Sequence, residues 1–463
     1  MPSEDTIVAI STPPGRGGLG VVRLSGPRAI EISSQLLQVP QLETQRATVG
    51  TFCERPSGRV LDQVVVTCFR APHSYTGEDV VEVSCHGAPV ILRHFEACCV
   101  AQGARLAEPG EFTLRAFLKG RIDLTQAEAV RDLIDSQTLY QARVAAQQLE
   151  GSLSKRLRPQ KQTLVELIAR LEAGVDFAED DVSVIEWQEI ERRLAQIIAD
   201  LEKLAAGYAY GRVVREGLTL AIIGLPNVGK SSLFNCLLNQ ERAIVTPVPG
   251  TTRDLVAETA NLNGIPLRLV DTAGVRETID EVEKLGVERT LSAIADSDLR
   301  LLVIDASAPW TEENLTLLEK LRPLGALLIA LNKSDLPAPV APYEVAWIAL
   351  GSNTGGGQPE VVATSALTGA GIPELQGKLF ALAAPARDIG PEGEFITNGR
   401  HLQLIQQSLA SLSKARQAAV EQVHHELLLL DLYDGLRPLD LITGATYADD
   451  VLDVIFKTFC VGK

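Results

Sequence analysis

The segment from Thr219 to Asn235, TLAIIGLPNVGKSSLFN, limits what this chain can fold into more than any other. A short apolar run ends at Gly224 and a helical pattern begins at Lys230, which predicts a strand, a glycine-rich loop and a helix. Glycines let the N–H groups of such a loop converge on phosphate oxygens. The spacing therefore predicts a P-loop, in which Lys230 contacts the β and γ phosphates and the Ser231 hydroxyl binds Mg²⁺.

Four further motifs follow the P-loop in a fixed order. They are Thr251-Thr252, Asp271-Thr272-Ala273-Gly274, Asn332-Lys333-Ser334-Asp335 and Ser365-Ala366-Leu367. The Asp271 carboxylate follows an apolar strand and can hold Mg²⁺ through water, Thr252 can complete the Mg²⁺ shell, and the Gly274 N–H can contact the γ phosphate. A single tetrapeptide of this kind is often only a turn, but the ordered set predicts one nucleotide site.

The Asp335 carboxylate predicts which base the site selects. Its two oxygens can accept the paired N–H donors of guanine, whereas adenine offers no such pair and would leave the carboxylate unsatisfied. Residues 216–382 therefore resemble a Ras-like GTPase domain with its site at the carboxyl edge of a mostly parallel sheet. The remaining residues expected to bind GTP are Asn227, Val228, Gly229, Ser232, Thr246, Pro247, Val248, Pro249 and Gly250.

Val275 follows Gly274, at the position where many Ras-like enzymes carry the glutamine that orients the attacking water. An apolar side chain cannot do this, so the water and the transition-state charge must be handled otherwise. The Asn227 side-chain carbonyl could hold a monovalent cation, and the acidic run 280–283 could supply a mobile carboxylate. The alternatives are that Asn227 only tolerates a tight turn and that the run is a solvated helix start.

The whole chain sets broader limits. Its 463 residues predict two or three domains, and 43 basic against 59 acidic residues give a net charge of −16. Any nucleic acid must therefore meet local basic patches, such as the cluster Lys155, Arg156, Arg158 and Lys161 or the pair Arg212 and Arg215, although a solvated helix face is the default explanation of each. Seven cysteines without a CxxC pair, no leader and no long apolar segment predict a cytoplasmic chain without membrane contact.

The regions outside 216–382 show two different patterns of apolar residues. Short apolar runs at 7–10, 20–24, 64–69 and 80–84 between glycine and proline clusters predict a compact α+β domain in residues 1–120. Within it, the glycines of 12–26 predict a tight hairpin, with Arg16 and Arg23 solvated. Residues 121–215 show helical periodicity that predicts three helices, and residues 383–463 show the same periodicity. We expect both arms to form one helical domain into which the nucleotide domain is inserted.

Taken together, the motifs resemble the MnmE (TrmE) family of tRNA uridine modification GTPases over the whole chain. The resemblance rests on DTIVAISTPPGRGGLGVVRLSG at 5–26, YTGEDVVEVSCHG at 75–87, EPGEFTLRAFLKGRIDLTQAEAVRDLID at 108–135, GLPNVGKSS at 224–232, PGTTRD at 249–254, DTAGVRETIDEVEKLG at 271–286 and the terminal CVGK. It implies an N-terminal folate-binding-like and dimerisation domain (1–120), a discontinuous helical domain (121–215 and 383–463) and an inserted Ras-like GTPase domain (216–382).

The resemblance also assigns roles in GTP hydrolysis. It implies that Asn227, Thr246, Val248 and Thr251 bind K⁺, which supplies the positive charge that an arginine supplies elsewhere. It matches Glu283 to a glutamate that positions the attacking water. Because mobile switch segments must become ordered for this, it further implies that two copies of the nucleotide domain activate each other as a dimer.

A second set of implied roles concerns one-carbon chemistry. Arg23, Glu82, Arg121 and Lys463 match positions that contact a folate, either 5-formyl- or methylene-tetrahydrofolate. Some family members carry Lys where this chain has Arg121, and here Lys119 lies two residues earlier. Cys460 matches the C-terminal motif, as a nucleophilic thiol or as a small buried residue.

The implied function is a K⁺-stimulated GTPase that, with a flavin-dependent partner of the MnmG (GidA) family, installs a carboxymethylaminomethyl or related group at C5 of the wobble uridine, position 34, of tRNA. The implied assembly is a homodimer that joins the partner in a heterotetramer. The main alternative is a ribosome-assembly GTPase, but the GxxG at 15–18 follows two prolines between strands, where a turn is expected. A membrane-remodelling GTPase would need an amphipathic or apolar insert, which the sequence does not show.

Overall fold

The computed structural model describes residues 5–39, 41–54, 57–176, 185–239, 258–271, 294–337, 360–383, 395–446 and 449–462. It divides into two compact units, and each is described here by itself. The first unit consists of Met1–Arg131, Gln148–Ala169 and Leu432–Lys463. The second consists of Asp132–Gln147 and Arg170–Asp431.

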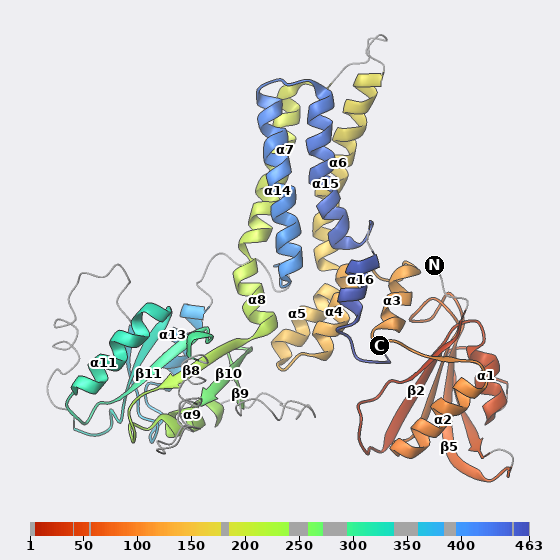
Figure 1. Cartoon of the computed structure of the whole chain (residues 1–463), viewed down its shortest axis with the longest axis horizontal. Coiled ribbons are helices and arrows are strands. Elements are labelled where there is room, and N and C mark those ends of the chain that lie inside the picture. The colour runs from red at the N-terminus through yellow and green to blue at the C-terminus, as the bar shows by residue number, and fades with distance from the viewer. Residues whose placement is uncertain are drawn as a thin grey trace, which may run out of the picture. The chain divides into compact units, whose positions relative to one another are not determined.

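A seven-stranded sheet forms the first half of the first unit, in the order β3-β4-β5-β6-β2-β1-β7. All neighbouring strands are antiparallel except β1 and β7, which are parallel. Helices α1 and α2 pack against it (Figure 1). The elements are β1 (Ile7–Ile10), β2 (Leu19–Ser25), α1 (Ala29–Leu36), β3 (Leu37–Gln38), β4 (Ala47–Cys53), β5 (Val60–Phe69), β6 (Val80–His86), α2 (Pro89–Ala101) and β7 (Arg105–Leu106).

Strand β5 shows why this segment becomes a sheet. Val64, Val66 and Cys68 point into the core, whereas Gln63 and Val65, which alternate with them, are exposed, and this is the period of two that a half-buried strand requires. Helix α2 begins at Pro89, a residue that lacks the N–H which the first helical turn cannot use. The four strands predicted in residues 1–120 are therefore confirmed, and so is the hairpin, since β1 and β2 pair directly.

The remaining helices of the first unit gather around an aromatic cluster. Phe117 of α3 (Glu111–Leu118) and Leu124 of α4 (Leu124–Ile134) pack with Phe456 of α16 (Asp449–Phe456) and with Phe459. Residues from the two ends of the chain thus share one core. The C-terminal segment continues from this cluster to the first strand, because the Ser11 hydroxyl donates to the Gly462 carbonyl.

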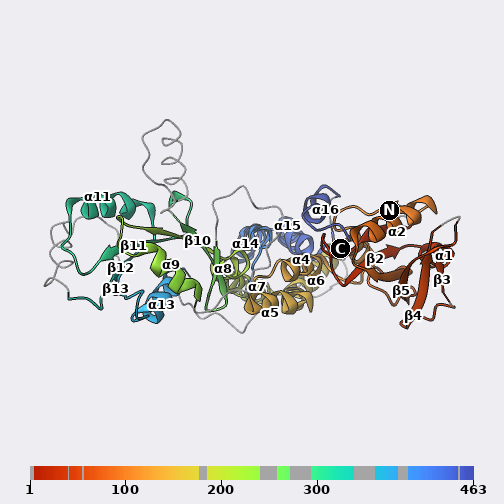
Figure 2. The same ribbon diagram turned by 90° about the horizontal axis from the view of Figure 1, so that it is seen from below.

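A second sheet of six strands, β13-β12-β11-β8-β10-β9, forms the core of the second unit. Among these described strands, only β9 is antiparallel to its neighbour. Helix α11 covers one face, and α9 and α13 cover the other (Figure 2). The elements are β8 (Leu218–Ile223), α9 (Lys230–Asn239), β9 (Glu258–Leu262), β10 (Ile265–Asp271), β11 (Leu299–Asp305), α11 (Glu312–Leu321), η2 (Arg322–Leu324), β12 (Leu327–Asn332), β13 (Glu360–Ala363) and α13 (Ile372–Ala383).

The helical part of the second unit consists of residues that precede the strands of this sheet in the sequence and residues that follow them. Helix α7 (Trp187–Ala206) packs along α14 (Gly399–Val420), as Figure 1 shows. The start of α7 meets the residues beyond the end of α14, since the rings of Trp187 and His425 lie 4.5 Å apart. The two helices are therefore antiparallel, and the expectation that the arms before and after the nucleotide domain pack together is confirmed.

The expectation of three helices in 121–215 is wrong, because the described residues of this range form five. Besides α4 and α7 they are α5 (Leu139–Leu149), α6 (Ser152–Asp176) and α8 (Tyr208–Glu216). Gly151, with φ +81°, separates α5 from α6 without interrupting the apolar periodicity. Helices α6 and α15 (His425–Thr443) have residues in both units. No helix in the described ranges is long and apolar enough to cross a membrane.

Candidate functional site

The carboxyl ends of four parallel strands bring the predicted nucleotide motifs to one edge of the six-stranded sheet. The P-loop follows β8, Asp271 ends β10, Asn332 ends β12 and Ser365 follows β13. Parallel strands joined in this way form a ligand crevice outside their carboxyl ends. The structure therefore places the described members of the ordered motif set along one edge, on either side of the strand that carries the P-loop.

Two glycines of the P-loop have no room for a side chain. A Cβ on Gly224 would lie 2.4 Å from the Val303 carbonyl oxygen, and one on Gly229 would lie 2.2 Å from Nδ2 of Asn332. Gly229 also has φ +93°, and Asn227 lies in the left-handed region with φ +63°. Asn227 thus occupies a position that asparagine tolerates well, and its exposed side chain is accessible to a ligand of the loop.

Lys230 begins helix α9, and its ammonium lies back over the loop. It donates to the carbonyl oxygens of Gly224 at 2.9 Å and Leu225 at 2.8 Å. Ser231 and Ser232 follow in the first helical turn and are exposed, whereas Val228 is buried. The positive charge, the hydroxyls and the helix N-terminus all lie at the P-loop, which suits a phosphate group and a hydroxyl-bound Mg²⁺.

Asn332 joins three loops of the edge through one side-chain amide. Its Nδ2 donates to the Val228 carbonyl at 2.9 Å, and its Oδ1 accepts from the Ala366 N–H at 3.0 Å. The residue is only 2% exposed, so both bonds lie away from water. Because Val228 is in the P-loop and Ala366 is in the last motif, this amide holds the phosphate-binding and base-binding loops at a fixed spacing.

Lys333 and Asp335 of the same motif carry the charges. The Lys333 ammonium pairs with the Asp305 carboxylate at the end of β11. Burial alone would raise the pKa of the Asp305 carboxyl, but the hydrogen bonds from Lys333 and Ser307 together lower it. Asp335 is exposed, as guanine recognition requires. In the last motif Ser365 is buried and Leu367 is 87% exposed.

Several predicted residues lie outside the described ranges. They are Thr246, Pro247, Val248, Pro249, Gly250, Thr251, Thr252, Thr272, Ala273, Gly274, Glu283 and Lys463. Asp271 is described as the last residue of β10. Of the predicted K⁺ ligands the structure thus describes Asn227, and of the predicted Mg²⁺ ligands it describes Ser231.

The predicted folate residues Arg23 and Glu82 face each other across β2 and β6. The Arg23 guanidinium donates to Oε1 of Glu82 at 2.6 and 2.9 Å, and its carbon lies 5.7 Å from the ring centres of Tyr75 and Phe112. The expectation that Arg23 is solvated is wrong, since its side chain is only 17% exposed, whereas Arg16 is exposed. An ion pair between two aromatic rings can offer hydrogen bonds and ring stacking to a heterocycle.

Arg121 and the C-terminal segment belong to the same unit. A Cβ added to Gly77 would lie 3.4 Å from Cγ of Arg121, so the Arg121 side chain lies against the loop that carries Tyr75. Cys460 is exposed, and its carbonyl accepts weakly from Gly110 at 3.4 Å, while Val461 bridges to Pro109. The alternative that Cys460 is a buried small residue is therefore wrong. Gly462 lies against Ile10, whose neighbour Ala9 pairs with Arg23.

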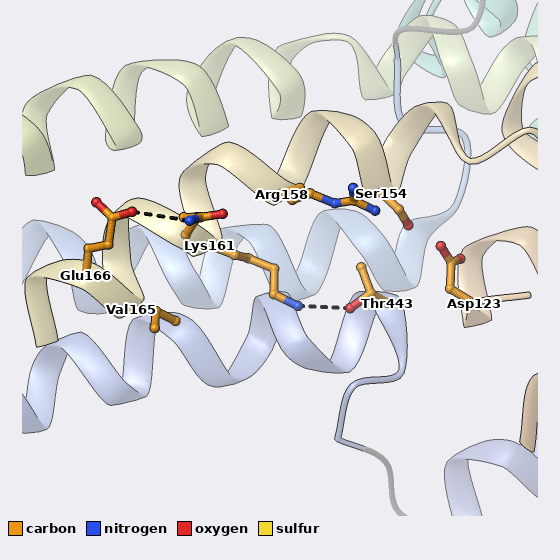
Figure 3. A pocket seen from close by; sticks show the side chains of 8 residues that line it. Asp123, Ser154, Arg158, Lys161, Val165, Glu166 and Thr443 are labelled. Atoms are coloured by element: carbon orange, nitrogen blue, oxygen red, sulfur yellow. Dashed lines mark hydrogen bonds between the residues drawn. The ribbon is translucent and has the colours of Figure 1, made fainter. Parts of the chain in front are cut away.

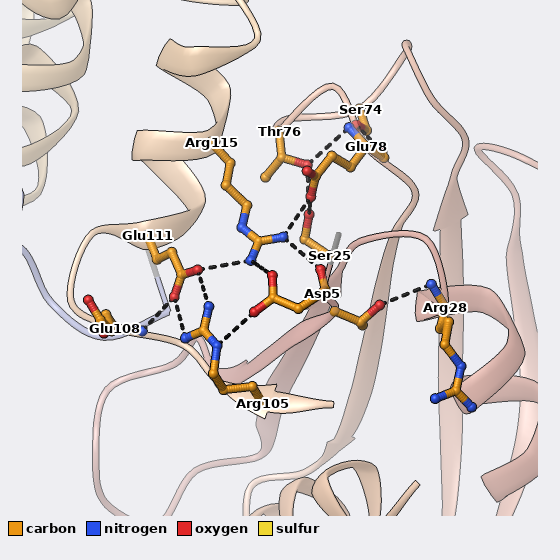
Figure 4. A network of polar contacts seen from close by, with 11 residues as sticks. Asp5, Ser25, Arg28, Ser74, Thr76, Glu78, Arg105, Glu108, Glu111 and Arg115 are labelled. Carbon is orange, nitrogen blue, oxygen red and sulfur yellow. Dashed lines mark hydrogen bonds and ion pairs between the residues drawn. The ribbon is translucent and has the colours of Figure 1, made fainter. Parts of the chain in front are cut away.

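A second charged group in this unit surrounds the buried side chain of Arg115 (Figure 4). Arg115, which is 4% exposed, contacts the carboxylates of Asp5, Glu78 and Glu111 at 2.8 to 3.0 Å. Burial alone would raise the pKa of Glu111, but hydrogen bonds from Arg105, Arg115 and the backbone lower it. The guanidiniums of Arg105 and Arg115 offset most of the charge of the three carboxylates, so this network has a structural role and holds α3 against the 74–79 loop.

Arg158 and Lys161 of the basic cluster on α6 line a shallow pocket of about 430 Å³ between the start of α4, α6 and α15 (Figure 3). Lys161 pairs with Asp440 at 2.6 Å and donates to Thr443 at 3.1 Å. Asp123 and Glu166 also line the pocket. The negative side chains offset the positive ones, which gives the pocket no clear preference for an anion such as RNA phosphate.

The other basic pair is also neutralised. Arg215 contacts the Asp132 carboxylate at 2.8 Å with 16% of its side chain exposed, and Arg212 lies 3.6 Å from Asp298. Neither patch is therefore an open basic surface.

Comparison with known proteins gives two family matches and close relatives. The model of the "MnmE helical domain" matches residues 124–460, and that of the "GTP-binding protein TrmE N-terminus" matches residues 6–121. The chain belongs to the MnmE family. The protein of Koribacter versatilis named tRNA modification GTPase MnmE is 54% identical, and those of Acetivibrio thermocellus and Geobacillus kaustophilus are 41% and 42% identical. Each match covers 100% of both chains.

Membership of the MnmE family confirms three predictions. The first is the family itself. The second is the multidomain fold, with a folate-binding-like start, a split helical domain and an inserted Ras-like domain, and it also agrees with the observed sheets and helices. The third is the class of GTP-hydrolysing tRNA modification enzyme. Sequence reasoning missed Tyr75 and Asp305. Tyr75 begins one of the quoted family segments, whereas Asp305 gives no signal beyond its place after an apolar strand.

Proposed function

We propose that this chain binds and hydrolyses GTP at the edge described above, and that the hydrolysis cycle drives modification of C5 of the wobble uridine, position 34, of tRNA. The observation that carries the proposal is the Asn332 amide, which fixes the P-loop and the base-binding loop relative to each other. Such a frame suits a ligand with phosphates at one end and a planar base at the other. The full-length relatives named tRNA modification GTPase support the tRNA substrate.

In this function each described residue has a defined task. The P-loop backbone and the Lys230 ammonium bind the phosphates, the Ser231 hydroxyl binds Mg²⁺, and the Asp335 carboxylate accepts from guanine. The predicted tasks of Thr252, Asp271 and Gly274 at Mg²⁺ and the γ phosphate complete this site. Glu283 is our candidate for orienting the attacking water, since Val275 has no polar group.

Potassium, when bound, supplies positive charge beside the phosphates. The fit of this chain to such an ion rests on Asn227, whose exposed amide lies in a left-handed turn of the loop. We assign it as a K⁺ ligand together with Thr246, Val248 and Thr251. A ligand set from both the P-loop and the segment before β9 would also order that segment for hydrolysis.

We further propose that the N-terminal domain binds 5-formyl- or methylene-tetrahydrofolate as the one-carbon source. Glu82 would accept from the N–H groups of the pterin, the rings of Tyr75 and Phe112 would contact it, and Arg121 and Lys463 would meet the anionic tail. Cys460 lies in the same unit and is exposed, which gives its thiol access to a reacting carbon.

The assembly we propose is a cytoplasmic homodimer that joins an MnmG (GidA) family FAD protein in a heterotetramer. Domain boundaries near 120, 215 and 382 belong to this proposal. The two copies would associate through residues 1–120 and, during hydrolysis, through their nucleotide domains.

The cation assignment is tested by hydrolysis rates in matched chloride salts. We expect the rate to fall at least tenfold when Na⁺ replaces K⁺, because the smaller ion does not match the same oxygen ligands. In an Asn227→Ala variant the rates in the two salts should converge. Equal rates in K⁺ and Na⁺ for the unaltered chain would remove the cation from the mechanism.

A further inference from the structure

A joint between α5 and the nucleotide domain has no assigned role. Helix α5 begins with the sequence Thr138-Leu139-Tyr140-Gln141, which is a capping box. The Thr138 hydroxyl accepts from the Gln141 N–H at 3.2 Å, and the Gln141 Oε1 accepts from the N–H groups of Gln137 at 2.8 Å and Thr138 at 3.3 Å. Thr138 and Gln141 are each only 8% exposed, although the cap of an isolated helix would face water.

The spare donors of this capping box bind a turn of the nucleotide domain and the end of the helix that precedes this domain. The Thr138 hydroxyl donates to the carbonyl of Gly264, in the turn between β9 and β10. The Gln141 amide donates to the carbonyls of Val214 at 2.8 Å and Arg215 at 3.0 Å, at the end of α8. One helix start is thus bonded both to a hairpin turn and to the helix that leads into β8.

Packing around the joint is close. A Cβ at Gly264, which has φ +90°, would lie 2.7 Å from Cβ of Tyr140, so only glycine lets the turn approach α5. The hydroxyls of Tyr140 and Tyr210 are 2.9 Å apart, and Val144 of α5 belongs to the apolar core of the six-stranded sheet. Helix α5 therefore contacts the nucleotide domain through fixed bonds and not through a loose surface.

The hairpin is well placed to report the nucleotide state. Strand β9 is the edge strand and, among the described strands, pairs only with β10. The chain before β9 contains Thr252, a predicted Mg²⁺ ligand, and β10 ends at Asp271, three residues before Gly274, the predicted γ-phosphate contact. The distance along β10 from its turn to Asp271 is roughly 23 Å at about 3.3 Å per residue. A tilt of this strand pair would move Gly264 at its far end.

We propose that the Thr138–Gln141 capping box couples the β9–β10 hairpin to α5. A shift of the hairpin between the GTP-bound and GDP-bound states changes the position of α5 through this box, and Gln141 and Thr138 act as positioning residues. When the hairpin and α8 move relative to each other, the bonds of the box cannot all be kept, so α5 must follow or its first turn must open. Neither residue belongs to the predicted nucleotide site. As a route to tRNA modification the proposal rests on the proposed function, but the coupling itself does not.

Hydrogen exchange on the full-length chain with GDP or a non-hydrolysable GTP analogue tests the joint. We expect amides of 138–142 to change their exchange rate at least threefold between the two nucleotides, in parallel with 262–266. In Gln141→Glu, whose carboxylate would face two carbonyls, and in Thr138→Val, the difference at 138–142 should disappear while that at 262–266 remains. Thr138→Ser keeps the hydroxyl and should behave like the unaltered chain.

The matched control is Leu139→Glu, which adds the same negative charge to the same helical turn. The Leu139 side chain is 78% exposed and takes no part in the capping box, so this variant should leave both differences between nucleotides unchanged. A nucleotide response at 262–266 with none at 138–142 in the unaltered chain would overturn the proposal. So would a full response at 138–142 in folded Gln141→Glu.

A second readout separates coupling from general damage. We expect Gln141→Glu to hydrolyse GTP within about twofold of the unaltered chain but to modify tRNA at least tenfold more slowly. Hydrolysis and modification that fall by the same factor would instead show that Gln141 serves only the fold of the nucleotide domain. If the unaltered chain modifies no tRNA, the proposed function fails, and the exchange experiment still decides the coupling.

Discussion

The nucleotide edge and the Arg115 network use charged and neutral polar groups in opposite ways. At the edge, a neutral amide, Asn332, holds the loops together, and the Lys230 ammonium rests on backbone carbonyls. In the network, a buried guanidinium is surrounded by three carboxylates. A site that binds a charged ligand must leave charge for that ligand, whereas a structural network neutralises its own.

The Arg23–Glu82 pair lies between these two cases. It is an ion pair like those of the network, but Glu82 is 31% exposed and aromatic rings flank the arginine. Its charges are satisfied without a ligand and remain accessible to one. We therefore expect it to contribute less to ligand affinity than Asp335 and less to stability than Arg115.

The largest effect should come from Asp335→Asn. The amide keeps one acceptor oxygen but places an NH₂ group opposite the second guanine N–H donor, so GTP should bind at least about 10³-fold more weakly. The amide can instead donate to the second carbonyl of xanthine, so xanthosine triphosphate should gain affinity. Titration with fluorescent analogues of both nucleotides measures the change in preference from the guanine to the xanthine nucleotide. Unchanged GTP affinity would remove Asp335 from base recognition.

Arg115→Met should lower the free energy of unfolding by about 3 kcal/mol, because the mostly buried Glu78 carboxylate loses its guanidinium partner, whereas Glu111 and Asp5 keep Arg105. The matched control is Arg46→Met, since the Arg46–Glu43 pair is mostly exposed and should contribute under about 0.5 kcal/mol. Denaturant unfolding measures both, and GTP affinity should not change in either variant. A loss of nucleotide affinity in Arg115→Met would break the distinction between the two regions.

The same network predicts a pH dependence. The pKa of Glu111 is lowered in the folded chain, so its contribution to stability is complete above the ordinary carboxyl pKa and is lost as the pH falls through the folded value. Unfolding curves of the intact chain should therefore show a steeper loss of stability below about pH 4.5 than those of Glu111→Gln.

Asn332→Ala should weaken GDP binding by about tenfold to thirtyfold, or roughly 2 kcal/mol, since two buried hydrogen bonds between loops are lost. Asn314 offers a control, because it is a buried amide of the same domain on α11 whose described hydrogen bond, from its N–H to the Thr311 hydroxyl, joins no loop of the site. Asn314→Ala should lower the melting temperature without changing GDP affinity. Equal effects of the two variants on affinity would show that Asn332 only stabilises the domain.

The smallest effect should be that of Glu82→Ala on folate binding. We expect about a tenfold loss of affinity for a 5-formyl folate in calorimetry, the effect of one charge-assisted hydrogen bond. Glu31→Ala, in an exposed pair with Arg28 of the same domain, should titrate like the unaltered chain. Identical titrations for Glu82→Ala would count against the pocket.

The sequence was sufficient where a motif has a rigid backbone requirement. Gly224, Gly229 and Asn227 can be assigned from the P-loop spacing, and the strands around them follow from apolar runs. The helical arms were harder. Leu427 and Leu430 continue the apolar period of α14 but are 59% and 61% exposed, because Gln422, with φ +52°, ends that helix and the next begins in another phase.

Side-chain partners from distant segments were beyond prediction from sequence. Nothing local indicates that Arg23 meets Glu82, 59 residues away, or that Thr138 bonds to Gly264, 126 residues away. The capping box itself could have been found as Thr-x-x-Gln. Its use as a joint depends on the tertiary fold, which brings a hairpin turn and a helix end to the same helix start.

The account is tested most directly by mass spectrometry of nucleosides from tRNA of cells that lack this chain. The cells are restored with the intact gene, with Asp335→Asn, or with Cys460→Ser. We predict that 5-substituted wobble uridines vanish without the chain and return only with the intact gene, while purified Cys460→Ser still hydrolyses GTP. Unchanged nucleosides in cells without the chain would contradict the account, and ribosome assembly would become the pathway to examine.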